Sequence, residues 1–194
     1  MQEINPIKEE MLESAKYVFA KYGYKKTTMN DIAKAVGIAK SSLYYYFSSK
    51  DEIFTCVVEN ELIKAKDLCL MNASKAEDCI GKLKAYVFAT QGRISDLAEE
   101  FGNTIISEFF EFIPHIKNVV RKHMEDHVNT ISQIIEKGVK QGIFFTDNPK
   151  MSAEAIIIAF IPFAERSPLQ SLLDVDNNVT NDLFRILVNG LSSR

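Results

Sequence analysis

Residues 27–53 decide the fold, and their sequence is TTMNDIAKAVGIAKSSLYYYFSSKDEI. Thr28 followed three residues later by Asp31 predicts a capped helix start, and Gly37 predicts the left-handed turn that ends this helix. Leu43 comes six residues after Gly37 and anchors a second, short helix over about 40–47. The spacing predicts a helix-turn-helix, with Ala33 as the small residue where the two helices cross.

The second helix of this unit has one polar and aromatic face. If Leu43 points inward and each residue turns by ~100°, Phe47 also faces the core. The outward and flanking positions are then Lys40, Ser41, Ser42, Tyr44, Tyr45 and Tyr46. Hydroxyl groups bond to bases or phosphates and rings contact thymine methyl groups, so this face suits the major groove of duplex DNA.

These residues resemble the DNA-binding segment of the TetR family of regulators. The resemblance rests on Thr28-x-x-x-Ile32-Ala33, on Leu43-Tyr44-Tyr45-Tyr46-Phe47, and on Lys50 followed by an acidic residue. It implies that base edges or nearby backbone are contacted by Lys40, Ser41, Ser42 and Tyr44. It implies that phosphates are held by Thr28, Tyr45, Tyr46 and Lys50, with one of the three tyrosines serving mainly in packing.

Two departures from the family pattern concern which DNA sequence is bound. Ala39 stands where the family usually has a serine that caps the second helix, and Ser41 stands where it often has glycine. The first arginine of the chain is Arg93, so the helix-turn-helix lacks the commonest guanine-binding side chain. We therefore expect Lys40 to provide most of the guanine contacts and the target site to be rich in A·T pairs.

Charge is unevenly distributed along the chain. Residues 14–50 hold seven lysines and one acidic residue, so this segment carries a charge of +6. The remaining residues carry −9, which gives the chain its net charge of −3. A basic block on an acidic chain is typical of a local polyanion-binding site, although a solvated lysine-rich face gives the same count.

Beyond residue 50 the apolar spacing stays helical, and no strand pattern is convincing. The expected fold is all-α with about nine helices. After the fourth helix the expected spans are about 76–93, 95–112, 115–141, 151–165 and 177–191, and the expected breaks are at Pro114, Gly142, Asn148-Pro149 and Ser167-Pro168. We expect a helix-turn-helix domain at 1–50 and a helical ligand-binding and dimerisation domain at 51–194.

The second domain is rich in phenylalanine, since eleven of the thirteen Phe residues follow residue 50. Core packing explains most of them, but a cavity between helices is also a usual kind of pocket. The resemblance implies a small-molecule ligand, which we expect to be apolar or amphipathic and to contact Phe88, Gln91, Ile106 and Phe110. Segments 151–165 and 177–191 hold the family's dimerisation position. There we expect an interface of Ile156, Ile157, Phe160, Ile161, Ala164, Leu183, Ile186, Leu187 and Gly190, unless these residues form an internal core.

Enzymatic and cofactor-dependent functions find little support. His123 and His127 are four residues apart, as two metal ligands on one helix can be, but no third ligand is evident and a solvated face is expected. We predict no metal and no cofactor. Cys56, Cys69 and Cys79 lack metal-type spacing and indicate free thiols in a reducing cytoplasm. No secretion signal or membrane-spanning run is found.

The leading hypothesis is a homodimeric repressor that leaves a palindromic operator when it binds a small ligand. One alternative is a DNA-binding or nucleoid protein without an effector, which predicts a filled second domain. The other is a metal-dependent hydrolase using His123 and His127, although no phosphate loop, nucleophile motif or complete metal set is present.

Overall fold

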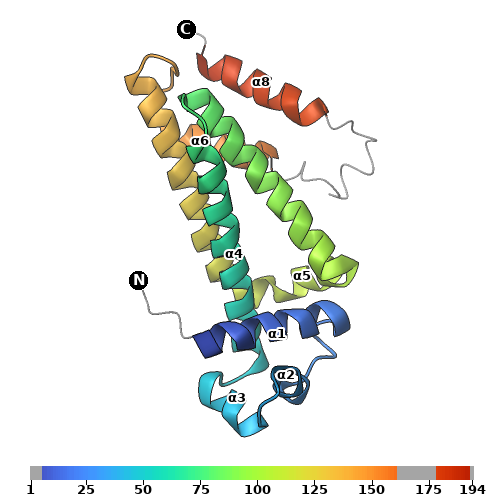
Figure 1. Cartoon of the computed structure of the whole chain (residues 1–194). Coiled ribbons are helices and arrows are strands. Elements are labelled where there is room, and N and C mark those ends of the chain that lie inside the picture. Colours follow the sequence, from blue (N-terminus) through green and yellow to red (C-terminus); the bar gives the residue numbers. More distant parts are fainter. Residues whose placement is uncertain (1–5, 161–177, 193–194) are drawn as a thin grey trace. The chain divides into compact units, whose positions relative to one another are not determined.

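The structure is a computed structural model that describes residues 6–160 and 178–192; for residues 94, 95 and 97–115 it describes the backbone only. The described part is helical throughout, which confirms the all-α class (Figure 1). Its helices are α1 (Pro6–Tyr22), α2 (Met29–Val36), α3 (Lys40–Tyr46), α4 (Lys50–Ser74), α5 (Cys79–Lys140), α6 (Pro149–Phe160) and α8 (Asn178–Ser192). Among the described residues no helix is both long enough and apolar enough to cross a bilayer.

The chain divides into two compact units. Residues 1–62 and 97–121 form the first unit, and residues 63–96 and 122–194 form the second. Helices α4 and α5 therefore contribute to both units, and the first unit extends beyond the first fifty residues.

The first unit is built on the apolar face of α1. This helix begins at Pro6, whose missing N–H is not needed in the first turn, and it ends before Gly23, which has a φ of 79°. Its buried face packs with α2, α3 and the start of α4 in one core, which includes Phe19, Ile32, Leu43, Ile53 and Phe54. The helix-turn-helix therefore shares one core with α1 and the start of α4.

The second unit contains two antiparallel arms of α5. A straight helix of 62 residues would be about 93 Å long, yet Cys79 Sγ lies 3.2 Å from Gln141 Oε1. The helical run must therefore reverse between the two arms, and it does so between Tyr86 and His127, whose side chains are in hydrogen-bond contact. The expected division into helices at 76–93, 95–112 and 115–141, with a break at Pro114, is thus wrong, because the helical run is continuous from Cys79 to Lys140.

The second core closes around the end of α5. Phe144 is fully buried against Gly138, and the amide of Phe145 donates to the carbonyl of Leu191 in α8 at 2.6 Å. Phe160 of α6 and Phe184 of α8 complete this core, with ring centroids 6.3 Å apart.

Only some of the residues expected at a dimer interface are exposed to a partner chain. Ile156 and Phe160 are buried in the chain's own core, so placing them at an interface is wrong. Ile186 on α8 is 64% exposed, in agreement with its expected place at an interface, and Ile158 on α6, which was not expected there, is 72% exposed. Gly190 is exposed as expected, Ile157, Leu183 and Leu187 are half-buried, and Ile161 and Ala164 lie outside the described residues.

Candidate nucleic-acid interface

The first helix of the motif is capped as the sequence predicts. Thr28 Oγ1 accepts from the amide of Asp31, while the Asp31 carboxylate accepts from the amide and the hydroxyl of Thr28 at 3.0 and 2.7 Å. These bonds hold the pKa of the Asp31 carboxyl below its usual range. Gly37 has a φ of 80°, and its amide closes the helix on the carbonyls of Ala33 and Lys34.

Helix α3 presents a polar and aromatic face. Leu43 and Phe47 are buried, whereas Lys40, Ser41, Ser42 and Tyr44 are exposed. Tyr45 is the most exposed of the tyrosines, at 84%. The sequence-based orientation of this helix is therefore confirmed. Leu43 and Phe47 pack in the first core, and the opposite face of α3 is exposed.

Tyr46 differs from its two neighbours. It is half-buried and packs against the first core, with its ring edge-on to Tyr45 at 5.1 Å between centroids. It is thus the tyrosine with the largest packing role. Ala39 makes no side-chain cap on α3, and Ser41 does not replace it, because the only cap bonds at this end are to the backbone carbonyl of Ala39.

Lys50 lies at the start of α4, where the Ser49 hydroxyl accepts from the amide of Glu52 and caps the helix. Its Nζ donates to the carbonyl of Tyr24 at 2.8 Å and lies 4.1 Å from the centre of the Tyr24 ring. Sequence reasoning missed Tyr24, because it is 26 residues from Lys50 and only the packed core brings the two together.

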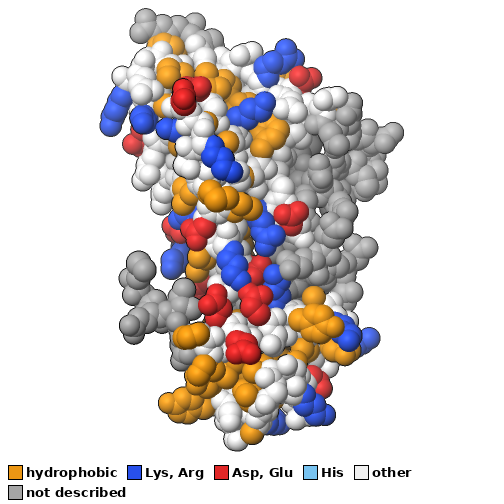
Figure 2. Space-filling model, in the orientation of Figure 1, with side chains coloured by type: hydrophobic (Ala, Val, Ile, Leu, Met, Phe, Trp, Pro, Cys, Tyr) orange, Lys and Arg blue, Asp and Glu red, His pale blue; other side chains and the backbone are white. Residues whose placement is uncertain are grey.

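The lysines of the basic segment have different surroundings. Lys16 is mostly buried and pairs with Glu61 at 2.9 Å, so it contributes to the core of the first unit. Lys25, Lys26, Lys34 and Lys40 are exposed. Figure 2 shows lysine and hydrophobic side chains sharing the surface at the end of the molecule that carries α2 and α3. A partner with negative charge and exposed methyl groups, such as the major groove of duplex DNA, fits this combination.

Two family models match this chain and identify its class. Residues 11–56 match the model for bacterial regulatory proteins of the tetR family, and residues 105–181 match the model for the tetracyclin repressor-like C-terminal domain. The chain belongs to the TetR family. It is a DNA-binding transcriptional regulator of a family that is not enzymatic, and the matched N-terminal segment contains α2 and α3.

Two curated relatives are themselves regulators. The chain is 26% identical to the uncharacterized HTH-type transcriptional regulator YfiR of Bacillus subtilis, over 70% of this chain and 66% of YfiR. It is 27% identical to IcaR of Staphylococcus aureus, the negative transcriptional regulator of the biofilm operon icaADBC, over 62% of this chain and 70% of IcaR. The chain thus spans about two thirds of the length of these relatives.

A solved structure shares the fold over the whole length. The fatty acid degradation regulator FadR from Bacillus halodurans superposes with a TM-score of 0.68, covering 100% of both chains at 20% identity. At this identity the match concerns the fold of this TetR-family chain.

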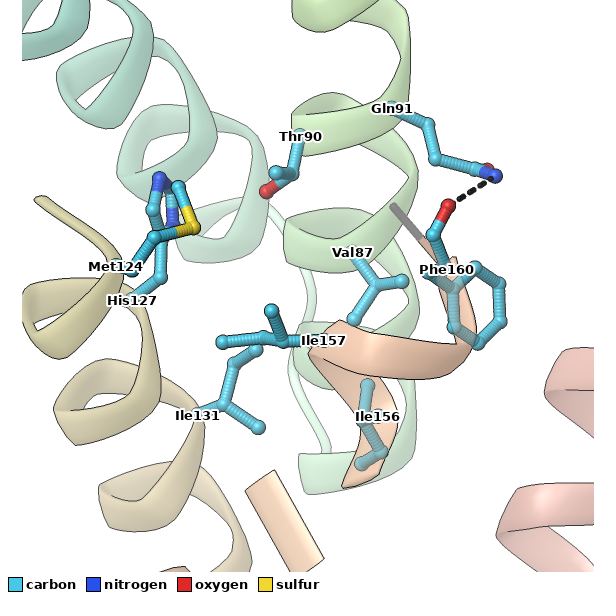
Figure 3. Close-up of a pocket in the computed structure, with 9 residues that line it drawn as sticks. All are labelled: Val87, Thr90, Gln91, Met124, His127, Ile131, Ile156, Ile157 and Phe160. Atoms are coloured by element: carbon cyan, nitrogen blue, oxygen red, sulfur yellow. Dashed lines mark hydrogen bonds between the residues drawn. The ribbon is translucent and has the colours of Figure 1, made fainter. Parts of the chain in front are cut away.

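The second unit contains a small cavity of about 20 Å³ between the two arms of α5 and helix α6 (Figure 3). It is lined by Val87, Thr90, Gln91, Met124, His127, Ile131, Ile156, Ile157 and Phe160. This volume holds about one water-sized group. The Gln91 amide is turned to the carbonyl of Phe160 at 3.3 Å, and the Thr90 hydroxyl donates to the carbonyl of Tyr86, so the wall that faces the cavity is apolar.

Among the described residues, one of the four that were expected to contact a ligand lines this cavity. Gln91 lines the cavity, whereas the ring of Phe88 packs on Phe160 and Phe184 beside it. Ile106 and Phe110 lie among the residues whose side chains the structure does not describe.

His123 and His127 are buried, so the expectation of a solvated face is wrong. Their Nε2 atoms lie 2.7 Å apart, and His127 Nδ1 lies 2.7 Å from the Tyr86 hydroxyl. Burial, together with His123 and Lys66, lowers the pKa of His127 to about 3, so the imidazole is neutral near pH 7. No group of three or more metal-ligating side chains is found among the described residues.

Proposed function

We propose that this regulator is a homodimeric repressor that binds a palindromic operator through α3 and leaves it when a small apolar or amphipathic molecule enters the second unit. The observation that carries the proposal is the exposed row of hydroxyl, ring and ammonium groups on α3, fixed from behind by Leu43 and Phe47. Each recognition helix would occupy the major groove of one half-site, with the half-sites about 34–36 Å apart.

The direction of regulation and the kind of ligand have separate support. IcaR is a negative regulator, which favours repression by this related chain. The surface that faces the cavity is apolar, because the polar groups of Thr90 and Gln91 are bonded to backbone carbonyls, and this favours an apolar ligand. FadR, which has the same fold, is named as a regulator of fatty acid degradation, and this name is consistent with an apolar or amphipathic ligand for the present chain.

A regulator without a small-molecule effector is the second candidate, and the small volume of the cavity favours it. A ligand larger than a few atoms must displace side chains among the described residues, and Met124 is the most adaptable of them. The two candidates therefore differ in whether any apolar compound weakens DNA binding.

The test begins with selection of bound duplexes from random DNA by the full chain. Apolar and amphipathic compounds are then screened for release of the selected duplex. The proposal predicts that a releasing compound binds the free protein more tightly than the DNA complex by the same factor by which it weakens DNA binding. Ile157→Phe, which fills the cavity, should still bind DNA but resist release. Release that is equally strong in Ile157→Phe contradicts this ligand site.

A further inference from the structure

Lys50 is held in one direction by Tyr24. Its Nζ donates to the Tyr24 carbonyl at 2.8 Å and lies 4.1 Å from the centre of the same residue's ring. A lysine on a surface normally samples many rotamers and loses that freedom when it binds a phosphate. Two contacts with one residue restrict the side chain of Lys50 before DNA arrives.

Tyr24 is itself fixed on three sides. Only 9% of it is exposed, and its ring packs on Phe19 and Phe54 with centroids 5.8 and 5.0 Å away. Its hydroxyl donates to the Asp51 carboxylate, the residue that follows Lys50. Burial and the bond to Asp51 raise the pKa of the Tyr24 phenol, so it stays a donor. The loop between α1 and α2 is thereby tied to the first turn of α4.

We propose that Tyr24 is a positioning residue for DNA binding, which aims the Lys50 ammonium at a backbone phosphate. The inference rests on the proposed function, because it takes Lys50 as a phosphate contact. A buried ring supplies an electron-rich face and a carbonyl supplies an acceptor, so both contacts orient the ammonium and leave it charged. The Asp51 carboxylate is engaged by the Tyr24 hydroxyl.

The alternative is that the Lys50–Tyr24 contact only stabilises the fold. A double-mutant cycle separates the two roles, since a positioning residue matters only while the group that it positions is present. The variants are Tyr24→Leu, Lys50→Ala and the double variant, measured for affinity to the selected duplex over a range of salt concentrations. Circular dichroism and thermal unfolding verify that each variant is folded.

Lys50→Ala should reduce the slope of log affinity against log salt by about 1.8 for a dimer that loses two phosphate contacts. Tyr24→Leu should weaken binding about five- to twentyfold when Lys50 is present, because two lysine side chains per dimer must then be ordered when DNA binds. In the Lys50→Ala background the same change should have less than about a twofold effect. Tyr24→Phe keeps the ring and the carbonyl and should bind nearly as well as the wild type, which covers the case in which Tyr24→Leu does not fold.

Equal losses from Tyr24→Leu in both backgrounds would overturn the positioning role, and so would an unchanged salt slope in Lys50→Ala. Loss of binding in Tyr24→Phe with an intact fold would also overturn it, because the ring and carbonyl would then be insufficient. Failure of the proposed function looks different: the wild type itself would select no duplex.

Discussion

His123 and His127 face each other through their Nε2 atoms at 2.7 Å, with both rings buried. One ring must donate and the other accept, so the pair is stable only while at least one imidazole is neutral. Tyr86 completes the chain on Nδ1 of His127, while Lys66 and Asp126 form an ion pair nearby. This arrangement makes the second unit sensitive to acid.

We expect stability to fall as the pH falls below about 6.5. Burial has the largest effect on the pKa of His127 and, together with the charges of His123 and Lys66, lowers it to about 3, although Asp126 acts in the opposite direction. Between the two pKa values, the imidazole is therefore protonated in the unfolded chain and neutral in the folded chain. The stabilisation is complete above the unfolded pKa, and at pH 5 His127 alone accounts for a loss of about 2 kcal/mol.

The measurement is urea unfolding at pH 7 and pH 5 at one protein concentration. His127→Gln, which cannot take up the proton, should lose clearly less stability between these two values than the wild type does. Equal losses in the two proteins would show that other groups dominate the acid response.

Gly138→Ala should destabilise the second unit. A Cβ built on Gly138 would lie 2.2 Å from Cδ2 of the buried Phe144 ring, so the ring would have to move. Overpacking of this kind costs about 1–3 kcal/mol. The matched control is Gly92→Ala, also on α5, where a Cβ meets nothing within 4 Å and the change should stabilise by about 0.5–1 kcal/mol. Thermal unfolding of both variants should show shifts of opposite sign, and a neutral Gly138→Ala would refute the close contact.

Ile158→Asp and Ile186→Asp should each convert the proposed dimer to a monomer. Both side chains are largely exposed in the single chain, and a two-fold interface would bury two unpaired carboxylates per change, at about 3 kcal/mol or more. Ile63→Asp on α4, a similarly exposed isoleucine, is the control and should stay dimeric. Sedimentation analysis decides, and dimers of unchanged affinity in both test variants would place the interface elsewhere.

Lys40→Ala should remove most of the guanine preference of the operator. The side chain is exposed at the first position of α3, with its Nζ 5.8 Å from the centre of the Tyr44 ring, and no arginine precedes Arg93. Sites selected by the wild type should be A·T-rich with few fixed guanines, and those of Lys40→Ala should lose them. Several invariant guanines that persist in the variant's sites would contradict this role.

The helix-turn-helix could be predicted from the sequence because its signals are local. The cap at Thr28, the left-handed Gly37, the buried Leu43 and the cap at Ser49 each act within a few residues. The polar face of α3 follows from helical periodicity once Leu43 is placed inward. The link between Tyr24 and Lys50 could not be predicted, since it depends on the loop between α1 and α2 meeting the start of α4 in the folded core.

The second unit was harder to predict for the same reason. His123 and His127 stand among charged residues, and their burial depends on Tyr86, 41 residues from His127 in the sequence. Pro114 is a local break signal, but the helical run of α5 is continuous through it, because tertiary packing of the two arms outweighs the local preference. Ile156 and Phe160 have the spacing of a buried helix face, and that spacing does not distinguish an internal core from a dimer interface.

The most direct test of the account concerns the face of α3. The affinity of the full chain for its selected duplex is compared with that for a scrambled duplex at physiological salt, for the wild type, the double variant Ser42→Ala/Tyr45→Ala, and Tyr17→Ala, an exposed tyrosine on α1. We predict at least about a thousandfold preference in the wild type and in Tyr17→Ala, and its loss in the folded double variant. A wild type without preference for any duplex, or a double variant that keeps the preference, would contradict the account.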